Sequence, residues 1–162
     1  METEKIIFRT QPLEEDIENI REIVTSTGFF YDYEIPVAVE LVEIRLSDGP
    51  ECGYYFIFAE VGGRTIAYSC YGPTACTNGT YDLFWIATHH DFRGKGIGKM
   101  LLEETNNAVR ELGGRMLVAE TSSQPKYTPT RHFYLNNGFK LEAEIADFYE
   151  IGDGKLVYIK RL

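Results

Sequence analysis

A glycine-rich segment between a strand pattern and a helix pattern constrains the fold of this chain more than any other feature. The run Arg93-Gly94-Lys95-Gly96-Ile97-Gly98-Lys99 follows Tyr81–Thr88, whose aromatic and branched residues predict a strand. Apolar residues then recur at helical spacing as far as Leu112. A strand, a tight turn and a helix must therefore follow one another. Such a turn presents backbone N–H groups at the positive end of the helix dipole, where anions bind.

The charges of this segment also indicate an anionic ligand. The first turn of a helix favours Asp or Glu, but Arg93, Lys95 and Lys99 gather here instead. A bound polyanion would offset the repulsion between these basic side chains and the positive end of the helix dipole. The dinucleotide fingerprint fails because Lys99 or Leu101 stands where its third glycine is needed. The phosphate loop of nucleotide hydrolases fails because Arg93 replaces its first glycine and Met100 its Ser or Thr.

Strand and helix patterns alternate along the whole chain. No repeat or Pro/Ser-rich linker interrupts them, so residues 1–162 are expected to form one domain. The order βααβββαβαββ predicts an α/β or α+β domain with a mixed sheet. Strand patterns cover residues 5–9, 54–60, 65–71, 81–88, 116–120, 139–145 and 156–159, and helix patterns cover 13–24, 36–46, 96–112 and 129–136.

The negative charge of the chain lies in its first half. Residues 1–79 hold 14 acidic and 5 basic residues, whereas residues 80–162 hold 11 of each, which gives the net charge of −9. Binding to nucleic acid or anionic lipid depends on Lys and Arg, so neither partner is expected. The acidic half either serves solubility alone or favours cationic substrates.

The first residues and the lack of a long apolar stretch predict a cytoplasmic protein. The start lacks the basic and apolar regions of a signal peptide, and no stretch supplies the roughly 20 apolar residues of a membrane span. Cys52, Cys70 and Cys76 are odd in number and lack CxxC spacing. We therefore expect buried or half-buried thiols, with no disulfide framework and no metal site.

Two motifs resemble the GCN5-related N-acetyltransferase (GNAT) superfamily. The glycine segment fits [RQ]-x-x-G-x-[GA] through Arg93, Gly96 and Gly98, and the phrase from Ile86 to Leu102 is similar to the central motif of that family. Tyr134-Leu-Asn-Asn-Gly-Phe139 resembles its downstream signature. The resemblance spans about residues 5–162 in element order and is most specific over about 80–139. It implies a mixed, mostly antiparallel sheet with helices on both faces.

The resemblance implies a binding site for acetyl-CoA, the acyl donor. The glycine segment would cradle the pyrophosphate, and the preceding strand would hold the pantetheine arm and supply the N–H of Ile86 to the carbonyl oxygen. At Tyr127 many relatives carry an asparagine that contacts the cofactor, so Arg131 or Lys126 is the alternative phosphate contact. The predicted cofactor residues are Ile86, Ala87, Thr88, Arg93, Gly94, Lys95, Gly96, Ile97, Gly98, Lys99, Tyr127 and Arg131.

The resemblance also implies catalytic residues. Tyr134 matches the general-acid tyrosine; the alternative is a packed aromatic residue of the helix. An alkylammonium with a pKa of about 10.4 needs a base, and Asp82 lies eleven residues before Arg93, where histone-acetylating relatives carry a glutamate. Asp82 would act through a water, or else form a salt bridge at the strand edge. Glu120, on the next strand, is the second candidate base.

The hypothesis is an acetyl-CoA-dependent N-acetyltransferase that acts on a small primary amine by direct transfer in a ternary complex. Peptide or protein amine acetylation and a non-catalytic acyl-CoA sensor are the alternatives. In the family the acceptor site uses segments that correspond to Phe29–Glu34 and Asp147–Glu150, which mix aromatic and acidic residues. The same surfaces also suit ordinary core packing or a homodimer contact. His89 and His90 are expected to be solvated turn residues.

Overall fold

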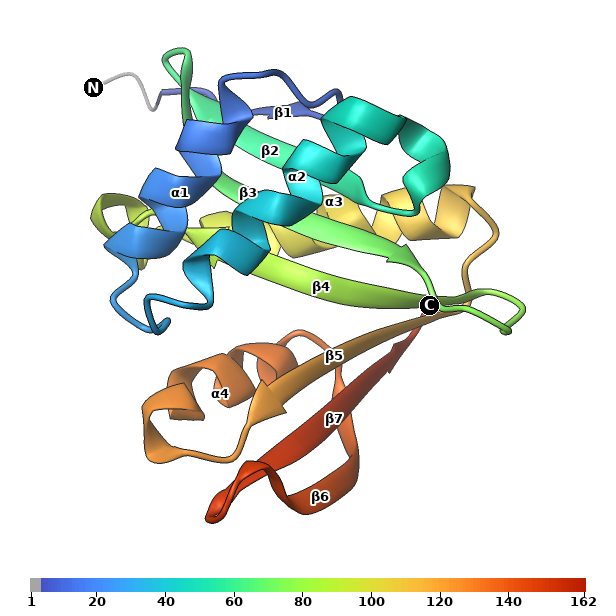
Figure 1. The fold of residues 1–162 in the computed structure, drawn as a ribbon. Coiled ribbons are helices and arrows are strands. Elements are labelled where there is room, and N and C mark those ends of the chain that lie inside the picture. The colour runs from blue at the N-terminus through green and yellow to red at the C-terminus, as the bar shows by residue number, and fades with distance from the viewer. Residues whose placement is uncertain (1–3) are drawn as a thin grey trace. The chain divides into compact units, whose positions relative to one another are not determined.

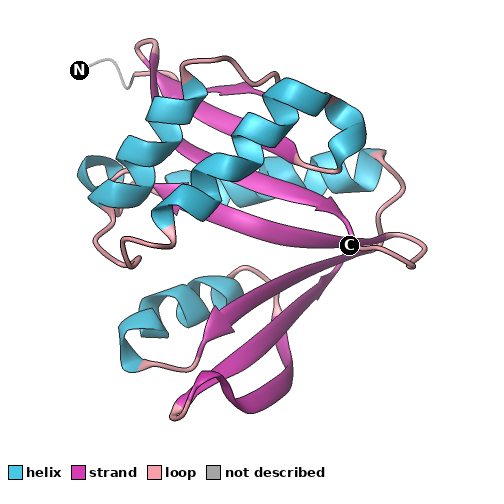
Figure 2. Ribbon diagram, in the orientation of Figure 1, coloured by secondary structure: helices cyan, strands magenta, loops and turns pink. Residues whose placement is uncertain are grey.

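The computed structural model describes residues 4–162, and its elements follow the predicted order (Figures 1 and 2). The strands are β1 (Ile7–Arg9), β2 (Tyr55–Val61), β3 (Arg64–Pro73), β4 (Thr80–Thr88), β5 (Met116–Ser122), β6 (Lys140–Glu150) and β7 (Asp153–Arg161). The helices are α1 (Asp16–Ser26), α2 (Ile35–Asp48), α3 (Ile97–Glu111) and α4 (Thr128–Asn136), with short 3-10 turns η1 (Pro50–Cys52), η2 (His90–Phe92) and η3 (Pro125–Tyr127).

The described strands pair in the order β1-β2-β3-β4-β5-β7-β6. The pairs β1–β2, β2–β3, β5–β7 and β6–β7 are antiparallel, whereas β4 and β5 are parallel through Thr80–Leu83 and Met116–Ala119. The predicted class, mixed α/β with a mostly antiparallel sheet, is confirmed.

The chain divides into two compact units. The first extends to Gly72 and includes Trp85–Thr105, and the second comprises Pro73–Phe84 and Asn106–Leu162. The expectation of a single domain over residues 1–162 stays a prediction.

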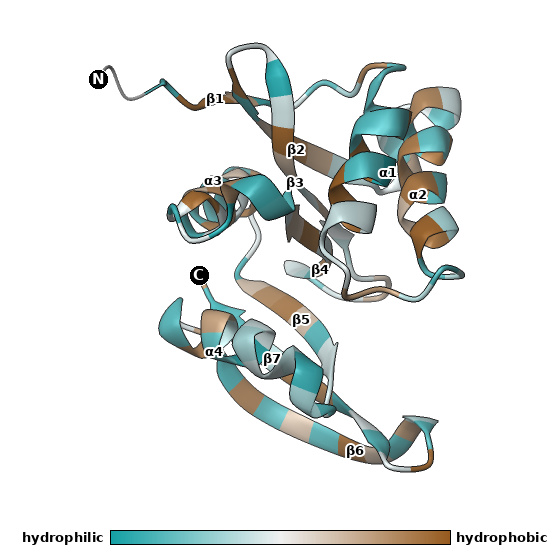
Figure 3. Cartoon of the chain, turned by 90° about the vertical axis from the view of Figure 1, so that its left-hand side faces the viewer, coloured by the Kyte–Doolittle hydropathy of each residue, from teal (hydrophilic) through white to brown (hydrophobic). Residues whose placement is uncertain are grey.

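In the first unit, α1 and α2 cover one face of the strands and the first turns of α3 cover the other (Figures 1 and 3). Eight consecutive residues of β3 are buried because helices cover both of its faces. Tyr68 and Cys70 pack under α1 and α2, whereas Ser69 Oγ lies 2.8 Å from Thr105 Oγ1 of α3. The two strands predicted at residues 54–60 and 65–71 form a hairpin that turns at Gly62-Gly63, and both glycines have the positive φ of a tight two-residue turn.

A buried ion pair joins β1 to α1. Asp16, which is fully buried, accepts hydrogen bonds from Arg9 Nη1 and Nη2 at 2.7 and 2.9 Å. The backbone N–H of Leu13 and the Asn19 amide donate to the same carboxylate, and Arg9 Nε donates to Glu60 on β2 at 2.7 Å. The hydrogen bonds that Arg9 donates to Asp16 raise the pKa of Arg9. This network fixes the short first strand against the helix that follows it.

In the second unit, Tyr134 of α4 packs against β7. Its ring centroid lies 5.1 Å from that of Phe139 and 5.8 Å from that of Tyr158. The side chains of Tyr134 and Phe139 are therefore part of the core of this unit.

Gly114, after α3, has no room for a side chain, because a Cβ there would overlap Val109 Cγ1 and come within 3.0 Å of the Tyr81 ring.

The edge strand β6 is exposed along all of its eleven residues. Figure 3 shows hydrophilic and hydrophobic segments alternating along it. The last hairpin is longer than predicted, since Glu150 pairs with Asp153 and the turn is at Ile151-Gly152. Gly152 N–H donates to Asp147 Oδ1 at 2.7 Å, which supports this turn.

One cysteine prediction is wrong. Cys70 is buried and Cys52 half-buried, as expected, but Cys76 is exposed. It has a φ of 61° in the turn between β3 and β4, where the chain reverses at the surface. Among residues 4–162, no helix is both long and apolar enough to cross a membrane.

Candidate functional site

The glycine segment of the first unit forms an open turn before α3. Gly94 and Gly96 have φ values of 73° and 77°, which side chains rarely adopt, and a Cβ at either position would meet no atom within 4 Å. Arg93, Lys95 and Lys99 are exposed, whereas Ile97 is buried and anchors the start of the helix. The turn therefore presents backbone and positive charge to solvent, which suits a polyanion.

Contacts with the end of α1 hold this turn. Arg93 Nη2 donates to the carbonyl of Thr27 at 3.2 Å, and its guanidinium lies 4.9 Å from the centre of the Phe29 ring. The backbone N–H of His90 donates to Ser26 Oγ at 3.0 Å. Residues at and just after the end of α1 thus contact both this turn and the 3-10 turn that precedes it.

The prediction that His89 is a solvated turn residue is wrong, although His90 is exposed. His89 is 8% exposed, its Nδ1 accepts from the N–H of Asp91, and its own N–H donates to the carbonyl of Ile66 at 2.7 Å. On the other side of the ring, Nε2 lies 3.4 Å from a Glu22 carboxylate oxygen. The ring caps the 3-10 turn that leads into the glycine segment, because tertiary contacts from α1 and β3 enclose it.

Replacing Gly96 with alanine is expected to weaken CoA binding about tenfold, because a left-handed φ costs a side chain about 1–2 kcal/mol and the turn would relax out of shape. Isothermal titration with CoA measures the loss. Gly63→Ala is the matched control: its φ is 80°, nothing lies within 4 Å of a Cβ there, and it belongs to the β2–β3 hairpin. Equal weakening in both variants would contradict a binding role for the glycine segment.

Residues Ile86–Thr88 form the end of β4 in the first unit. Ala87 is 7% exposed and belongs to the core under α1 and α2, while Ile86 and Thr88 are half-buried. Their assignment to the pantetheine arm, and that of the Ile86 N–H to the carbonyl oxygen, stay predictions.

In the second unit, both candidate bases lie on one face of the sheet. Asp82 pairs with Val118 in the parallel register, and Glu120 stands two residues further along β5, so their side chains point the same way. Lys155 of β7 shares this face, and its Nζ lies 2.6 Å from Glu120 Oε2. Two carboxylates and one ammonium thus form a group, which we call the acid–lysine cluster (Asp82, Glu120 and Lys155).

The surroundings of Asp82 raise its pKa. Burial is the largest cause, and the nearby charge of Glu120 adds to it, whereas the hydrogen bond from Thr74 Oγ1 at 2.8 Å and the charge of Lys155 act in the opposite direction. A carboxylate with a raised pKa is a better proton acceptor near neutral pH than an ordinary aspartate.

Tyr134 is 5% exposed in the second unit. Burial raises the pKa of its phenol, so the hydroxyl stays protonated at every working pH, as a proton donor must be. The same shift makes donation harder, by about 1.4 kcal/mol per pKa unit. Packing and proton donation are compatible here, and the catalytic role stays a prediction.

The guanidinium of Arg131 makes local hydrogen bonds. Nη1 donates to the carbonyls of Ser122 and Gln124, each at 2.9 Å, and Nη2 donates to Thr128 Oγ1. Tyr127 is half-buried at the end of η3, and Lys126 Nζ lies 5.1 Å from the centre of its ring. Arg131 therefore joins the end of β5 to the start of α4. Its contact with phosphate, and that of Tyr127 with the cofactor, stay predictions.

Sequence reasoning missed Thr74 and Lys155. Thr74 is in the turn after β3, and Lys155 is 35 residues beyond its partner Glu120. No spacing rule joins such positions: the register of β5 and β7 places Lys155 beside Glu120, and the turn between β3 and β4 places Thr74 beside Asp82.

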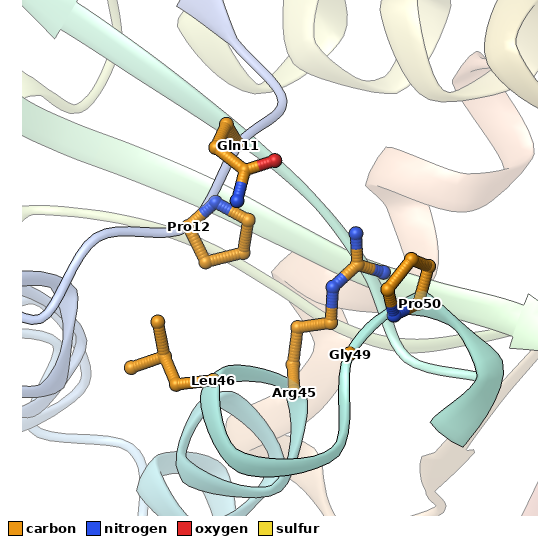
Figure 4. Close-up of a pocket in the computed structure, with 6 residues that line it drawn as sticks. All are labelled: Gln11, Pro12, Arg45, Leu46, Gly49 and Pro50. Carbon is orange, nitrogen blue, oxygen red and sulfur yellow. The ribbon is translucent and has the colours of Figure 1, made fainter.

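A cavity of about 160 Å³ lies in the first unit (Figure 4). It is lined by Gln11, Pro12, Arg45, Leu46, Gly49 and Pro50, none of which was predicted as a site residue. Among residues 4–162, no group of three or more His, Cys, Asp or Glu is arranged to hold a metal ion.

Known proteins match both the sequence and the fold. A family model described as "Acetyltransferase (GNAT) domain" matches residues 52–141. The crystal structure of a GNAT-family protein from Desulfovibrio desulfuricans is 46% identical, with a TM-score of 0.95 over 97% of this chain and 99% of that chain. No curated protein matches the sequence.

More distant structures share the fold alone. The ribosomal-protein-S18-alanine N-acetyltransferase of Escherichia coli is 16% identical, with a TM-score of 0.74 over 97% of this chain and 94% of that chain. The PaiA N-acetyltransferase of Thermoplasma acidophilum, in complex with coenzyme A, is 20% identical, with a TM-score of 0.71 over 98% of this chain and 99% of that chain.

Proposed function

The chain belongs to the GNAT family of acetyltransferases, and from this premise we propose that it transfers the acetyl group of acetyl-CoA directly to a small primary amine. The observation that carries the amine assignment is Asp82, a half-buried carboxylate whose raised pKa suits it to remove a proton from an ammonium. The family membership and the coenzyme A bound by the PaiA structure support the choice of donor.

The glycine segment would bind the donor. Its two left-handed glycines, the open space around them and the exposed Arg93, Lys95 and Lys99 fit a pyrophosphate. Residues Ile86–Thr88 would hold the pantetheine arm, and the N–H of Ile86 would stabilise the charge that develops on the carbonyl oxygen. The donor supplies an activated thioester, and these residues position it.

Proton transfer would involve two groups. Asp82 accepts a proton from the acceptor ammonium, directly or through one water, and Tyr134 donates a proton to the leaving thiolate. Glu120 is the weaker candidate base, because its ion pair with Lys155 engages one carboxylate oxygen.

Tyr134→Phe is expected to lower kcat about 100-fold, which is the lower end of the range for general-acid catalysis. The effect is at this end because the raised pKa makes the phenol a weaker proton donor. Stopped-flow detection of thiol release at saturating substrates measures it. Tyr158→Phe is the control, since Tyr158 packs beside Tyr134 and its loss reports packing alone. Unchanged kcat in Tyr134→Phe would refute the general-acid role.

Free-thiol release from acetyl-CoA across amino acids, polyamines, aminoglycosides and peptide N-termini tests the function. We expect a small cationic amine to turn over fastest, with a preference that weakens as salt rises, because the acidic first half attracts cations. Faster turnover of peptides would favour the peptide or protein acetyltransferase. CoA binding without thiol release from any amine would favour the acyl-CoA sensor.

A further inference from the structure

Lys155 is a primary amine that already lies against a carboxylate of the acid–lysine cluster. Its Nζ is 2.6 Å from Glu120 Oε2, within the hydrogen-bond distance that a general base needs to accept a proton. On the same face, Asp82 is close enough for the charge of Lys155 to lower the pKa of that carboxyl. The two side chains proposed as bases for an acceptor amine thus share a face of the sheet with an amine of the chain itself, and Glu120, on the strand between those of Asp82 and Lys155, contacts it.

The side chain of Lys155 is held in place. It is 16% exposed, and Nζ lies 4.4 Å from the centre of the Phe148 ring of β6. An ammonium against an aromatic face and a carboxylate is more restricted than a surface lysine. All four residues belong to the second unit. Restriction of this kind lowers the entropic cost of reaching an attacking geometry.

We propose that Lys155 is an acetylation site of this protein, modified in cis with acetyl-CoA as donor; this rests on the proposed acetyltransferase function. The Nζ–carbonyl carbon bond forms as the thioester C–S bond breaks. The ammonium gives up two protons, one to Glu120 and from there to solvent, and one to the leaving thiolate. The products are Nε-acetyllysine at position 155 and free CoA.

The modification would change the charge of the cluster. Acetylation removes the only cation of the group and leaves Asp82 and Glu120 without their shared counter-ion. Since Lys155 lowers the pKa of Asp82, its neutralisation raises that pKa. A base with a higher pKa loses activity at a higher pH as the solution is acidified. In the acetylated enzyme, the acidic limb of the pH profile of kcat/KM therefore lies at higher pH than in the unmodified enzyme.

Peptide mass spectrometry of the protein incubated with acetyl-CoA, without an added amine, tests the proposal. Lys155 is expected to gain an acetyl group at least about tenfold faster than Lys140, an exposed lysine in the same unit that reports chemical acetylation. The rate constant should not depend on protein concentration, and Tyr134→Phe should lower it while the Lys140 rate stays the same. Equal rates at the two lysines, or a rate constant that rises with concentration, would overturn the proposal.

The Lys155→Gln variant, whose neutral amide mimics acetyllysine, gives a second readout through the pH dependence of kcat/KM. In Lys155→Gln the acidic limb of kcat/KM for the best amine should move to higher pH, whereas Lys140→Gln should leave it in place. An unmoved limb in Lys155→Gln overturns the proposed control of Asp82. Turnover of an added amine with unmodified Lys155 refutes this inference and leaves the proposed function standing. Absence of both reactions refutes both.

Discussion

Replacing Asp82 with asparagine is expected to lower kcat/KM for the amine about 1000-fold, or about 4 kcal/mol, near the middle of the range for general bases. The amide has nearly the same shape and can still accept from Thr74 Oγ1, so the loss reports the proton acceptor rather than the fold. Initial rates of thiol release at low amine concentration measure it.

The pH dependence of kcat/KM distinguishes a catalytic role of Asp82 from a purely structural one. Burial raises the pKa of Asp82, so the wild-type acidic limb should lie above the range of an ordinary aspartate. Glu120→Gln is the matched control: it should cost about tenfold or less, and it should move this limb to lower pH, because the charge of Glu120 raises the pKa of Asp82. An Asp82→Asn variant that keeps the wild-type rate and limb would show that another group is the base.

Asp16→Ala is expected to reduce the free energy of unfolding by about 3–5 kcal/mol, the usual cost of removing one partner of a buried ion pair. The variant leaves the two Nη groups of Arg9 without their carboxylate and removes the acceptor of the Leu13 N–H. Glu60 still binds Arg9 Nε at 2.7 Å, so Arg9 keeps one counter-ion. Urea unfolding followed by circular dichroism measures the change.

The control is an exposed ion pair on the same helix. Glu18 and Arg21 lie 3.2 Å apart with side chains 75% and 44% exposed, so Glu18→Ala should cost less than about 1 kcal/mol. If Asp16→Ala cost no more than Glu18→Ala, the buried network would not fix β1 to α1. CoA binding by the folded Asp16→Ala protein should be unchanged, because the network is distinct from the glycine segment.

The predicted elements correspond one by one to those of the structure because their signals are local. The turn at Gly62-Gly63 and the turn at Gly113, just after α3 ends, use residues that tolerate positive φ. The last hairpin was underpredicted. Its extra residues carry mixed polarity on an exposed edge strand, so hydrophobic periodicity gave no signal there. The prediction of a solvated His89 is wrong because its burial comes from contacts with α1 and β3, which are distant in sequence.

The order of elements, the glycine turn with its basic side chains, and the candidates Asp82, Glu120 and Tyr134 were predictable before the fold was known. Only the folded chain shows that Asp82 and Glu120 share a face with Lys155, that Arg9 and Asp16 form a buried pair, and that Arg131 bonds to nearby carbonyls. The two groups of features differ in how far along the chain their causes lie. Turn and helix preferences depend on neighbouring residues, whereas the charge around a carboxylate depends on strand register between segments far apart in the chain.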